Sequence, residues 1–170
     1  MISISFGYRG YIPLAGLVAI LILGVSIIGI RAEEDLTVKV SANDAEMNAA
    51  IEKARASLST FWASYKAHNP SEEGHSLKVR FALPDNYAEH IWMVEVKKLA
   101  DNTYSGRFAN IPERLPGKQI GDVAEFREAD ISDWMFLRNG KIVGGETIRV
   151  VLKRMPKEDA DGLRVGFETP

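Results

Sequence analysis

The feature that most constrains this chain is an uncharged, apolar run near its N-terminus, residues 12–30. Its length matches the roughly 20 residues that a helix needs to cross a bilayer, so it predicts a transmembrane or signal helix. Arg9 precedes the run, whereas Arg31 is followed by the acidic residues 33–35. This charge distribution predicts a cytoplasmic N-terminus and an exported remainder. The expected membrane-facing residues are Ile12, Leu14, Leu17, Ile20, Leu21, Leu23, Ile27, Ile28 and Ile30.

Two interpretations of residues 12–30 remain open, a retained signal anchor and a cleaved signal peptide. The apolar part of a cleaved signal usually spans only about 7–15 residues, so the length favours the anchor. Ala32 is a candidate for the last residue before a cut, but Ile30 and Arg31 make a poor small-x-small cleavage site. A buried core helix would need a bundle that surrounds it on every side, and the sequence predicts no such bundle.

Composition excludes several classes of function. The chain of 170 residues carries 21 Lys and Arg against 23 Asp and Glu, a net charge of -2. It therefore lacks the basic excess that nucleic-acid phosphates attract, and we expect no nucleic-acid partner. It contains no Cys, which excludes disulfides, thiolate nucleophiles and Cys-ligated zinc. We assign no metal site and expect no cofactor.

An amphipathic helix is predicted after the linker. Asn43 and Glu46 have the spacing of a capping box, which opens a helix. Apolar residues then recur at helical spacing at Met47, Ala50, Ile51, Ala54, Leu58, Phe61, Trp62 and Tyr65. We expect this helix to end near Asn69 and Pro70. Its aromatic end is expected to pack on a sheet, with a partner-binding stripe as the alternative.

Beyond a polar loop at residues 70–75, the apolar period changes to two, which is typical of half-buried strands. The expected strands are residues 77–83, 90–99, 103–110, 123–127, 132–137 and 142–143. Their short connections predict an antiparallel meander. Asn139-Gly140, between the last two, is a strong signal for a two-residue hairpin.

A second short helix is expected at residues 146–155, where Ile148, Val151 and Leu152 share a helical face. A strand is the alternative there, because Val150 and its neighbours are β-branched. The predicted fold is therefore α+β, with one amphipathic helix packed on a curved antiparallel sheet of about five strands and a second short helix near the C-terminus.

The predicted organisation has four parts. Residues 1–31 form the signal anchor or signal peptide, residues 32–42 a linker, and residues 43–155 the soluble α+β domain. A first short strand is the alternative to a linker at residues 31–41, which are polar and β-branched. Residues 156–170 are charged and weakly patterned, which predicts a loose tail with at most one edge strand at 163–167.

Familiar catalytic motifs are absent from the sequence. It has no Walker loop, no Gly-x-Ser-x-Gly elbow, no His-Glu-x-x-His and no dinucleotide fingerprint, so we assign no catalytic residue. His90 with Asp130 or Asp133 is a candidate acid/base or metal pair, because a carboxylate can orient an imidazole. Glu89 and His90 point to opposite faces of their strand, however, and a hydrogen-bonded structural histidine is the favoured interpretation.

Polar residues beside aromatic ones suggest a ligand site. Trp92 and Trp134 are expected either to line a groove with Asp133 and Arg149 or to fill the core. The Gly144-Gly145 pair before a helix can offer backbone N–H groups to an anion, with Arg149 one turn further on. In the structural alternative, Thr147 and Arg149 tie the helix to Asp133. The candidate ligand-binding residues are Trp92, Trp134, Asp133, Arg149, His90, Gly144 and Gly145.

Several short motifs together resemble one bacterial family, domain of unknown function 2314. They are His90-Ile91-Trp92-Met93-Val94-Glu95-Val96, Tyr104-Ser105-Gly106 with Asn110 and Pro112, Gly121-Asp122, Ser132-Asp133-Trp134-Met135 and Gly144-Gly145-Glu146-Thr147-Ile148-Arg149. The likeness covers about residues 43–155, and Glu146 departs from the aromatic residue expected there. The family has no established activity, so the resemblance implies a bacterial origin and a fold but no catalytic residues.

The functional expectation follows from these parts. Residues 12–30 would hold the domain at the bacterial inner membrane as a single pass, with the domain in the periplasm or outside; secretion to the periplasm after signal cleavage is the alternative. We expect a non-catalytic module that binds a protein, such as an envelope protein, or a ligand. The alternatives are a small envelope enzyme using His90, Asp133 and Arg149, and an immunity-type protein.

Overall fold

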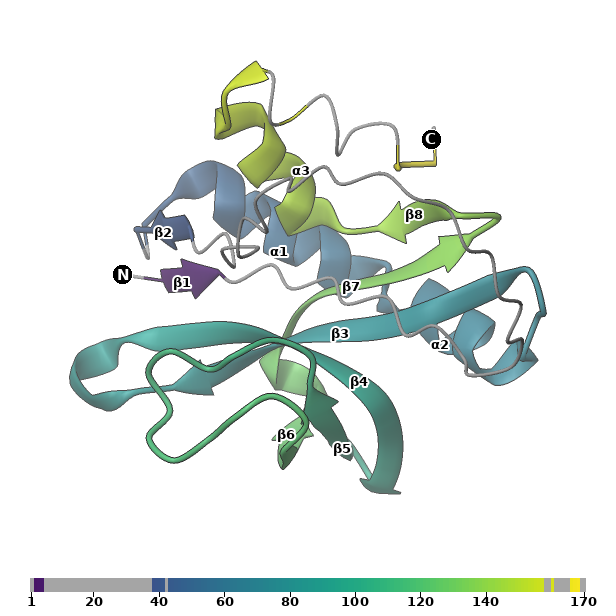
Figure 1. Ribbon diagram of the computed structural model, residues 1–170, viewed down its shortest axis with the longest axis horizontal. Coiled ribbons are helices and arrows are strands. Elements are labelled where there is room, and N and C mark those ends of the chain that lie inside the picture. Colours follow the sequence, from purple (N-terminus) through teal and green to yellow (C-terminus); the bar gives the residue numbers. More distant parts are fainter. Residues whose placement is uncertain (1, 5–37, 42, 158–159, 161–165, 169–170) are drawn as a thin grey trace, which may run out of the picture.

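The computed structural model describes residues 2–4, 38–41, 43–157, 160 and 166–168 (Figure 1). The apolar segment 12–30, with all of its expected membrane-facing residues, lies outside the described residues. Within the described ranges, no helix is long and apolar enough to cross a membrane.

The described residues form one eight-stranded sheet. Its strands are β1 (Ile2–Ile4), β2 (Val38–Val40), β3 (Glu72–Ala82), β4 (Ala88–Ala100), β5 (Thr103–Phe108), β6 (Val123–Arg127), β7 (Ile131–Arg138) and β8 (Lys141–Gly144). The α+β class is confirmed. The sheet is larger than expected because it also includes β1, which the sequence did not predict, and β2, which lies in the stretch that allowed either a linker or a first short strand.

Six strands form an antiparallel series in the order β6-β5-β4-β3-β7-β8. The edge of β4 that faces away from β3 is shared by two neighbours. β1 pairs in parallel with its first part, opposite Ala88 to His90, and β5 pairs with the part from Met93 to Ala100. Strands β6 and β8 therefore lie at the two ends of the series, as Figure 1 shows.

The single N-terminal helix expected from the sequence is in fact two, α1 (Ala45–Ala56) and α2 (Leu58–Ala67). The break falls at Ser57, whose hydroxyl donates to the carbonyls of Lys53 and Ala54 at 3.0 and 3.1 Å. A serine hydroxyl that bonds to preceding carbonyls competes with helix continuation, which is the physical reason for the break. The N-cap is Asp44 rather than Asn43, because the Asp44 carboxylate accepts from the Met47 N–H at 2.9 Å.

The strand boundaries differ from the prediction mainly at β3. Residues 72–75, expected as loop, belong to β3, whose first part pairs with β7. Glu72 lies opposite Arg138, and their side chains form an ion pair of 2.8 Å. These residues are polar and show no alternating apolar pattern. Pairing with β7 places them in a strand, and the sequence alone does not indicate that pairing. The Asn139-Gly140 hairpin and the strand at 123–127 are confirmed.

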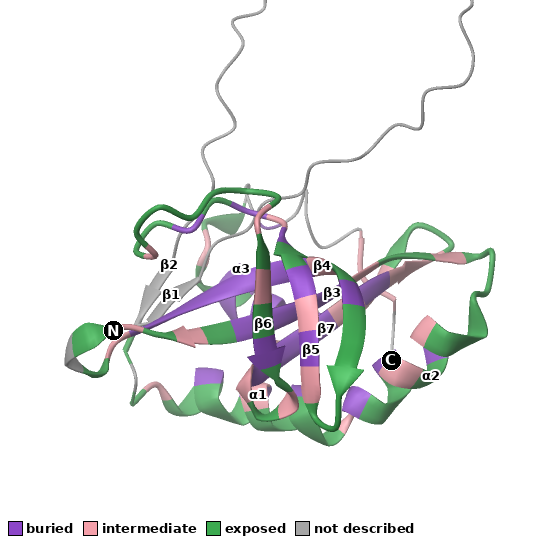
Figure 2. Ribbon diagram, turned by 90° about the horizontal axis from the view of Figure 1, so that it is seen from below, coloured by how far each residue is buried: buried purple, intermediate pink, exposed green. Residues whose placement is uncertain are grey.

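Both faces of the sheet are covered. One core joins Ala54, Leu58 and Phe61 of the helices to residues of β3, β4, β5, β6 and β7. A second cluster lies around Trp92 and includes Ile148 of α3 (Glu146–Arg154), the short helix predicted near the C-terminus. A third joins α1 to α3. Figure 2 shows the resulting burial, concentrated on β3, β4 and β7.

Part of the C-terminal segment packs on the edge of β8. The Ile142 N–H donates to the Gly166 carbonyl, and the Ile142 carbonyl accepts from the Glu168 N–H at 2.9 Å. Phe167 forms one parallel bridge with Ile142. The remainder of the edge strand expected at 163–167 lies outside the described residues.

Candidate functional site

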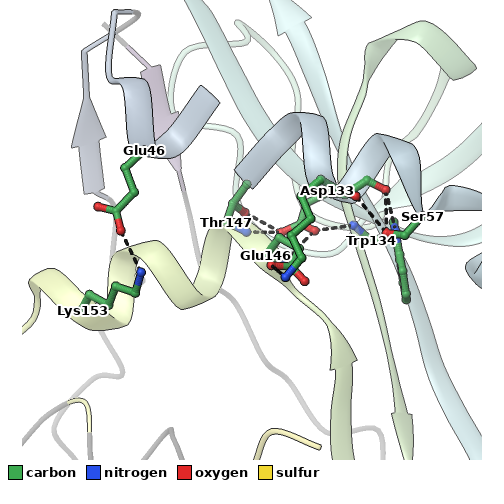
Figure 3. Close-up of polar contacts among 9 residues, drawn as sticks. Glu46, Ser57, Asp133, Trp134, Glu146, Thr147 and Lys153 are labelled. Carbon is green, nitrogen blue, oxygen red and sulfur yellow. Dashed lines mark hydrogen bonds and ion pairs between the residues drawn. The ribbon is translucent and has the colours of Figure 1, made fainter. Parts of the chain in front are cut away.

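Asp133 is the centre of a buried polar network. It is fully buried on β7, and its carboxylate accepts hydrogen bonds from the backbone N–H groups of Trp134 (2.8 Å), Glu146 (3.2 Å) and Thr147 (2.8 Å). The Thr147 hydroxyl donates to it as well, at 2.6 Å. Figure 3 shows these groups together at the start of α3.

These contacts make Asp133 the cap of α3. A helix begins with backbone N–H groups that have no partner within the helix, and a side chain of the N-cap residue usually accepts from one of them. The N-cap here is Gly145, which has no side chain. Asp133 supplies the acceptor from the neighbouring strand instead, and its negative charge also suits the positive end of the helix dipole.

Lys78 completes the network from β3. It is fully buried and lies opposite Asp133 in the β3–β7 register. Its Nζ donates to the Thr147 Oγ1 at 3.0 Å and lies 4.9 Å from the centre of the Trp92 ring. Thr147 thus links the two charged groups, because its hydroxyl accepts from Lys78 and donates to Asp133.

Burial acts on the two charged groups in opposite directions. It lowers the pKa of Lys78 to about 8, although attraction to the Asp133 carboxylate works against this shift. It raises the pKa of Asp133, against the attraction of Lys78 and the hydrogen bonds from Thr147. Burial thus disfavours the charge of each group, and the attraction between the two groups opposes this effect.

Lys78 was not among the residues singled out from the sequence. The alternation in residues 77–83 assigned it to the exposed face of a half-buried strand. That face is covered by α3, so Lys78 is buried, just as Val79 is buried on the opposite face of the strand. One sequence feature could have indicated that Lys78 is buried. The short amphipathic helix after β8 has an apolar face that has to pack on a surface, and this face of the sheet was available.

His90 is held by Ser132 rather than by an acid. Its Nδ1 lies 2.8 Å from the Ser132 Oγ, and the Ser132 hydroxyl donates to the Lys78 carbonyl at 3.1 Å. Since that hydroxyl has a single hydrogen, it accepts from His90, and Nδ1 carries the proton. Nε2 is buried and has no hydrogen-bond partner among the described residues. This is the structural histidine favoured from the sequence, not a pair with Asp130 or Asp133.

The surroundings of His90 keep its ring neutral. Burial lowers the pKa of His90 to about 3, and the nearby positive charges of Lys78, Arg80 and Arg55 add to the effect. Glu89, next to it, serves a separate purpose: its buried carboxylate accepts from the N–H groups of Glu113 and Arg114 at 2.6 and 3.0 Å. The opposite orientation predicted for these two neighbours agrees with their separate contacts.

The Gly144-Gly145 pair has a steric role. Gly144 has φ +81°, and a Cβ there would lie 2.4 Å from the Trp134 carbonyl oxygen. The Gly145 N–H donates to the same oxygen at 2.8 Å. The sequence allowed an anion to bind the backbone N–H groups at this helix start. In the structure, the Asp133 carboxylate accepts from those of Glu146 and Thr147. Arg149, one turn further on, lies 4.3 Å over the Phe167 ring.

The two tryptophans lie in different clusters. Trp134 belongs to the core under α1 and α2, where its Nε1 donates to the Ala54 carbonyl at 2.9 Å. Trp92 lies with Ile148 and Leu152 of α3. Among the described residues, the two tryptophans thus fill separate core clusters, which matches the core alternative rather than a shared groove. Of the candidate set, the structure brings together Asp133, Trp134, Gly144 and Gly145 at the start of α3. It leaves Trp92, His90 and Arg149 in other surroundings.

Exposed backbone groups and side chains that a partner could contact lie away from this network, at the edge of β6. Among the described residues, β6 pairs only with β5. The ladder ends with the bonds Phe108 N–H to Asp122 C=O and Glu128 N–H to Asn102 C=O. Because bonded pairs alternate in an antiparallel ladder, the backbone groups of Val123, Glu125 and Arg127 point away from β5. Their side chains are exposed as well, and β6 is largely green in Figure 2.

Apolar side chains are exposed beside this edge. Val123 is 53% exposed, and Ile120 and Ile111, in the segment that leads to β6, are 43% and 57% exposed. Glu89 holds that segment through its bonds to Glu113 and Arg114. By contrast, the edge strand at the other end of the series, β8, is covered by residues 166–168.

Comparison with known proteins gives a family match but no activity. The family described as "Uncharacterized protein conserved in bacteria (DUF2314)" matches residues 44–166. The uncharacterized protein YegJ of Escherichia coli (strain K12) is 38% identical over 76 residues. That match covers 45% of this chain and 49% of YegJ, so the chain spans about half the length of this relative. No solved structure matches the chain.

Proposed function

Because this chain belongs to domain of unknown function 2314, a family of uncharacterized bacterial proteins, we propose a function from its own surface: a non-catalytic module that binds a protein along the free edge of β6. In this proposal, residues 12–30 hold the module at the inner membrane and place it in the periplasm, or direct its secretion there.

The observation that carries the proposal is the difference between β6 and β8, the two end strands of the antiparallel series. A free strand edge presents N–H and C=O groups that another chain can pair with, and proteins usually cover or shorten such edges. The β8 edge is covered by residues 166–168, whereas β6 keeps outward-facing backbone groups at Val123 and Glu125. The outward-facing N–H of Arg127 donates to the Asp130 carboxylate at 3.2 Å. Addition of a strand at a free edge is a recurring mode of protein recognition.

The exposed apolar side chains favour the same surface. Ile111, Ile120 and Val123 lie on or before β6, and the Glu89 carboxylate fixes the segment that carries the first two. A fixed apolar surface is suited to a partner because little conformational entropy is lost when it binds.

The enzyme alternative gains no support from the contacts of its residues. Asp133 is fully buried and capped onto α3, His90 bonds to Ser132, and Arg149 lies over Phe167. A catalytic group has to reach its substrate, and these three side chains do not converge. An immunity-type role is a special case of the binding proposal, in which a toxin is the partner.

Photo-crosslinking tests this function. A photoreactive phenylalanine derivative is placed at Val123 or Ile120 of the full chain in living bacteria, with Ala63 and Lys66, exposed on α2, as matched controls. We expect adducts with another polypeptide from Val123 and Ile120 and none from the α2 positions. Adducts that form equally at all four positions, or at none, would overturn the proposal.

A further inference from the structure

We infer that the partner seated on β6 is a second copy of this chain, with the two β6 strands pairing antiparallel across a two-fold axis. The inference rests on the proposed function, because it takes the β6 edge as the binding surface. A two-fold interface uses the same surface on both copies, so that surface has to be complementary to itself.

The charges of β6 meet this requirement. Glu125 and Arg127 carry opposite charges on two outward-facing positions of the strand, and both are exposed. Neither forms an ion pair within the part of the chain that the structure describes. Because these opposite charges are separated by one residue, two copies of the strand can pair antiparallel with each Glu125 beside an Arg127 of the other copy. Two ion pairs then form.

Charge also selects the register. When Glu125 lies opposite Arg127 of the second copy, Arg127 lies opposite Glu125 in return, and two favourable cross-strand pairs form. When Glu125 lies opposite Glu125, like charges face one another directly, which is destabilising. Placing Val123 opposite Glu125 matches neither charge with its opposite. The backbone groups of Glu125 and Arg127 that this register uses point away from β5. The Glu125 N–H would donate to the Arg127 carbonyl of the second copy, whereas the Arg127 N–H would exchange its present acceptor, the Asp130 carboxylate at 3.2 Å, for the Glu125 carbonyl.

The interface is small, so we expect a weak dimer. β6 has five residues, and two such strands bury less than the roughly 1,200 Å² of a standard stable interface. The exposed side chains of Val123 and Ile120 add apolar area beside the strand. Anchoring both copies in one membrane would raise their effective concentration and so favour a pairing that is weak in dilute solution.

Charge reversal tests the pairing. The association of the full chain in detergent micelles is measured by analytical ultracentrifugation. We expect Glu125→Arg or Arg127→Glu to raise the dimer Kd about tenfold, because each removes two pairs and brings like charges together. The double variant Glu125→Arg/Arg127→Glu should restore the wild-type Kd, and Lys66→Glu, on α2, should leave it unchanged. Failure of the double variant to recover would contradict the reciprocal pairing.

Cysteine cross-linking tests the register directly, because the chain contains no Cys of its own. Bonded antiparallel positions have Cα atoms about 5.5 Å apart, which suits a disulfide. A mixture of Glu125→Cys and Arg127→Cys chains should give a cross-linked dimer under mild oxidation, whereas each variant alone should give little. Efficient cross-linking of Glu125→Cys with itself would overturn the register.

The outcomes separate this inference from the proposed function. A twofold-mass adduct from Val123 in the photo-crosslinking experiment supports the second copy. Adducts with a different protein, together with a wild-type chain that stays monomeric, reject the second copy and leave the function standing. Glu125→Pro removes both an outward-facing N–H and the Glu125 charge. A dimer that persists in this variant would place the interface elsewhere and also reject the inference.

Discussion

At the scale of single residues, the buried group around Asp133 combines two tasks that proteins usually separate. Its carboxylate closes the N-terminus of α3 and balances the charge of Lys78 on β3. A buried ion pair contributes little net stability by itself, because the loss of hydration offsets the attraction. Breaking one is costly, however, since the remaining charge stays in the interior. The network therefore fixes the position of α3 on the sheet, whereas its net contribution to the free energy of unfolding is small.

Substitutions at Asp133 and Lys78 should show this asymmetry. We expect Asp133→Asn or Lys78→Met alone to lower the free energy of unfolding by about 3–5 kcal/mol, because each leaves one buried charge without its counterpart. The double variant should lose clearly less than the sum of the two, a coupling that urea unfolding of all four proteins measures. Additive losses would mean that the two groups do not compensate one another.

His90 gives a second prediction at this scale, on pH. Its pKa in the folded protein is about 3, below the ordinary value of 6.5, so the unfolded state binds the proton more readily between these values. Stability linked to His90 is therefore fully present above pH 6.5 and is lost as the pH falls toward 3. Nitrogen-15 NMR should show a neutral ring at pH 5 with the proton on Nδ1. In His90→Gln, the acid loss of stability should be smaller.

At the scale of elements, the connection from β8 to α3 is set by steric fit. Gly144 and Gly140 both have positive φ, +81° and +74°, but their surroundings differ. A Cβ at Gly144 would meet the Trp134 backbone and ring, whereas nothing lies within 4 Å of a Cβ at Gly140. The first glycine is needed for space as well as for conformation, and the second only for conformation.

The two glycines form a matched pair of tests. We expect Gly140→Ala to cost about 1–2 kcal/mol, the usual penalty of a left-handed conformation. Gly144→Ala should cost about 2–5 kcal/mol, because overpacking adds to that penalty. Thermal unfolding followed by circular dichroism measures both. Equal losses would show that the contact with Trp134 relaxes without cost.

Elements with a local cause were predictable from the sequence. The Asn139-Gly140 hairpin follows from turn chemistry, and β6 and α3 follow from periodicity and Pro156. The break at Ser57 depends on one hydroxyl, and the early start of β3 depends on pairing with β7. The candidate set lacked Lys78 for a related reason. Asp133, Gly144 and Gly145 were identified from the sequence, but Lys78 is distant from them along the chain, and its link to Asp133 through Thr147 exists only because α3 covers that face of β3.

At the scale of the whole molecule, the compartment decides which partners the β6 edge can meet. Residues 12–30 are apolar for longer than a usual cleaved signal, and the sequence around Ala32 is a poor cleavage site. If the segment is a retained anchor, the two copies needed for β6 pairing are confined to one membrane plane. If it is removed, they diffuse freely and a weak pairing is lost.

The last prediction is therefore that the mature protein keeps residues 12–30 and exposes its domain to the periplasm. Intact mass measurement of the membrane fraction should give the uncleaved chain, whereas a chain that starts at Glu33 would contradict the anchor while leaving export possible. Because the chain has no Cys, Lys66→Cys on the exposed face of α2 reports the compartment. A maleimide that cannot cross the inner membrane should label it in intact cells with a permeabilised outer membrane. Labelling only after cell lysis would place the domain in the cytoplasm, and the membrane would then separate it from every partner in the envelope.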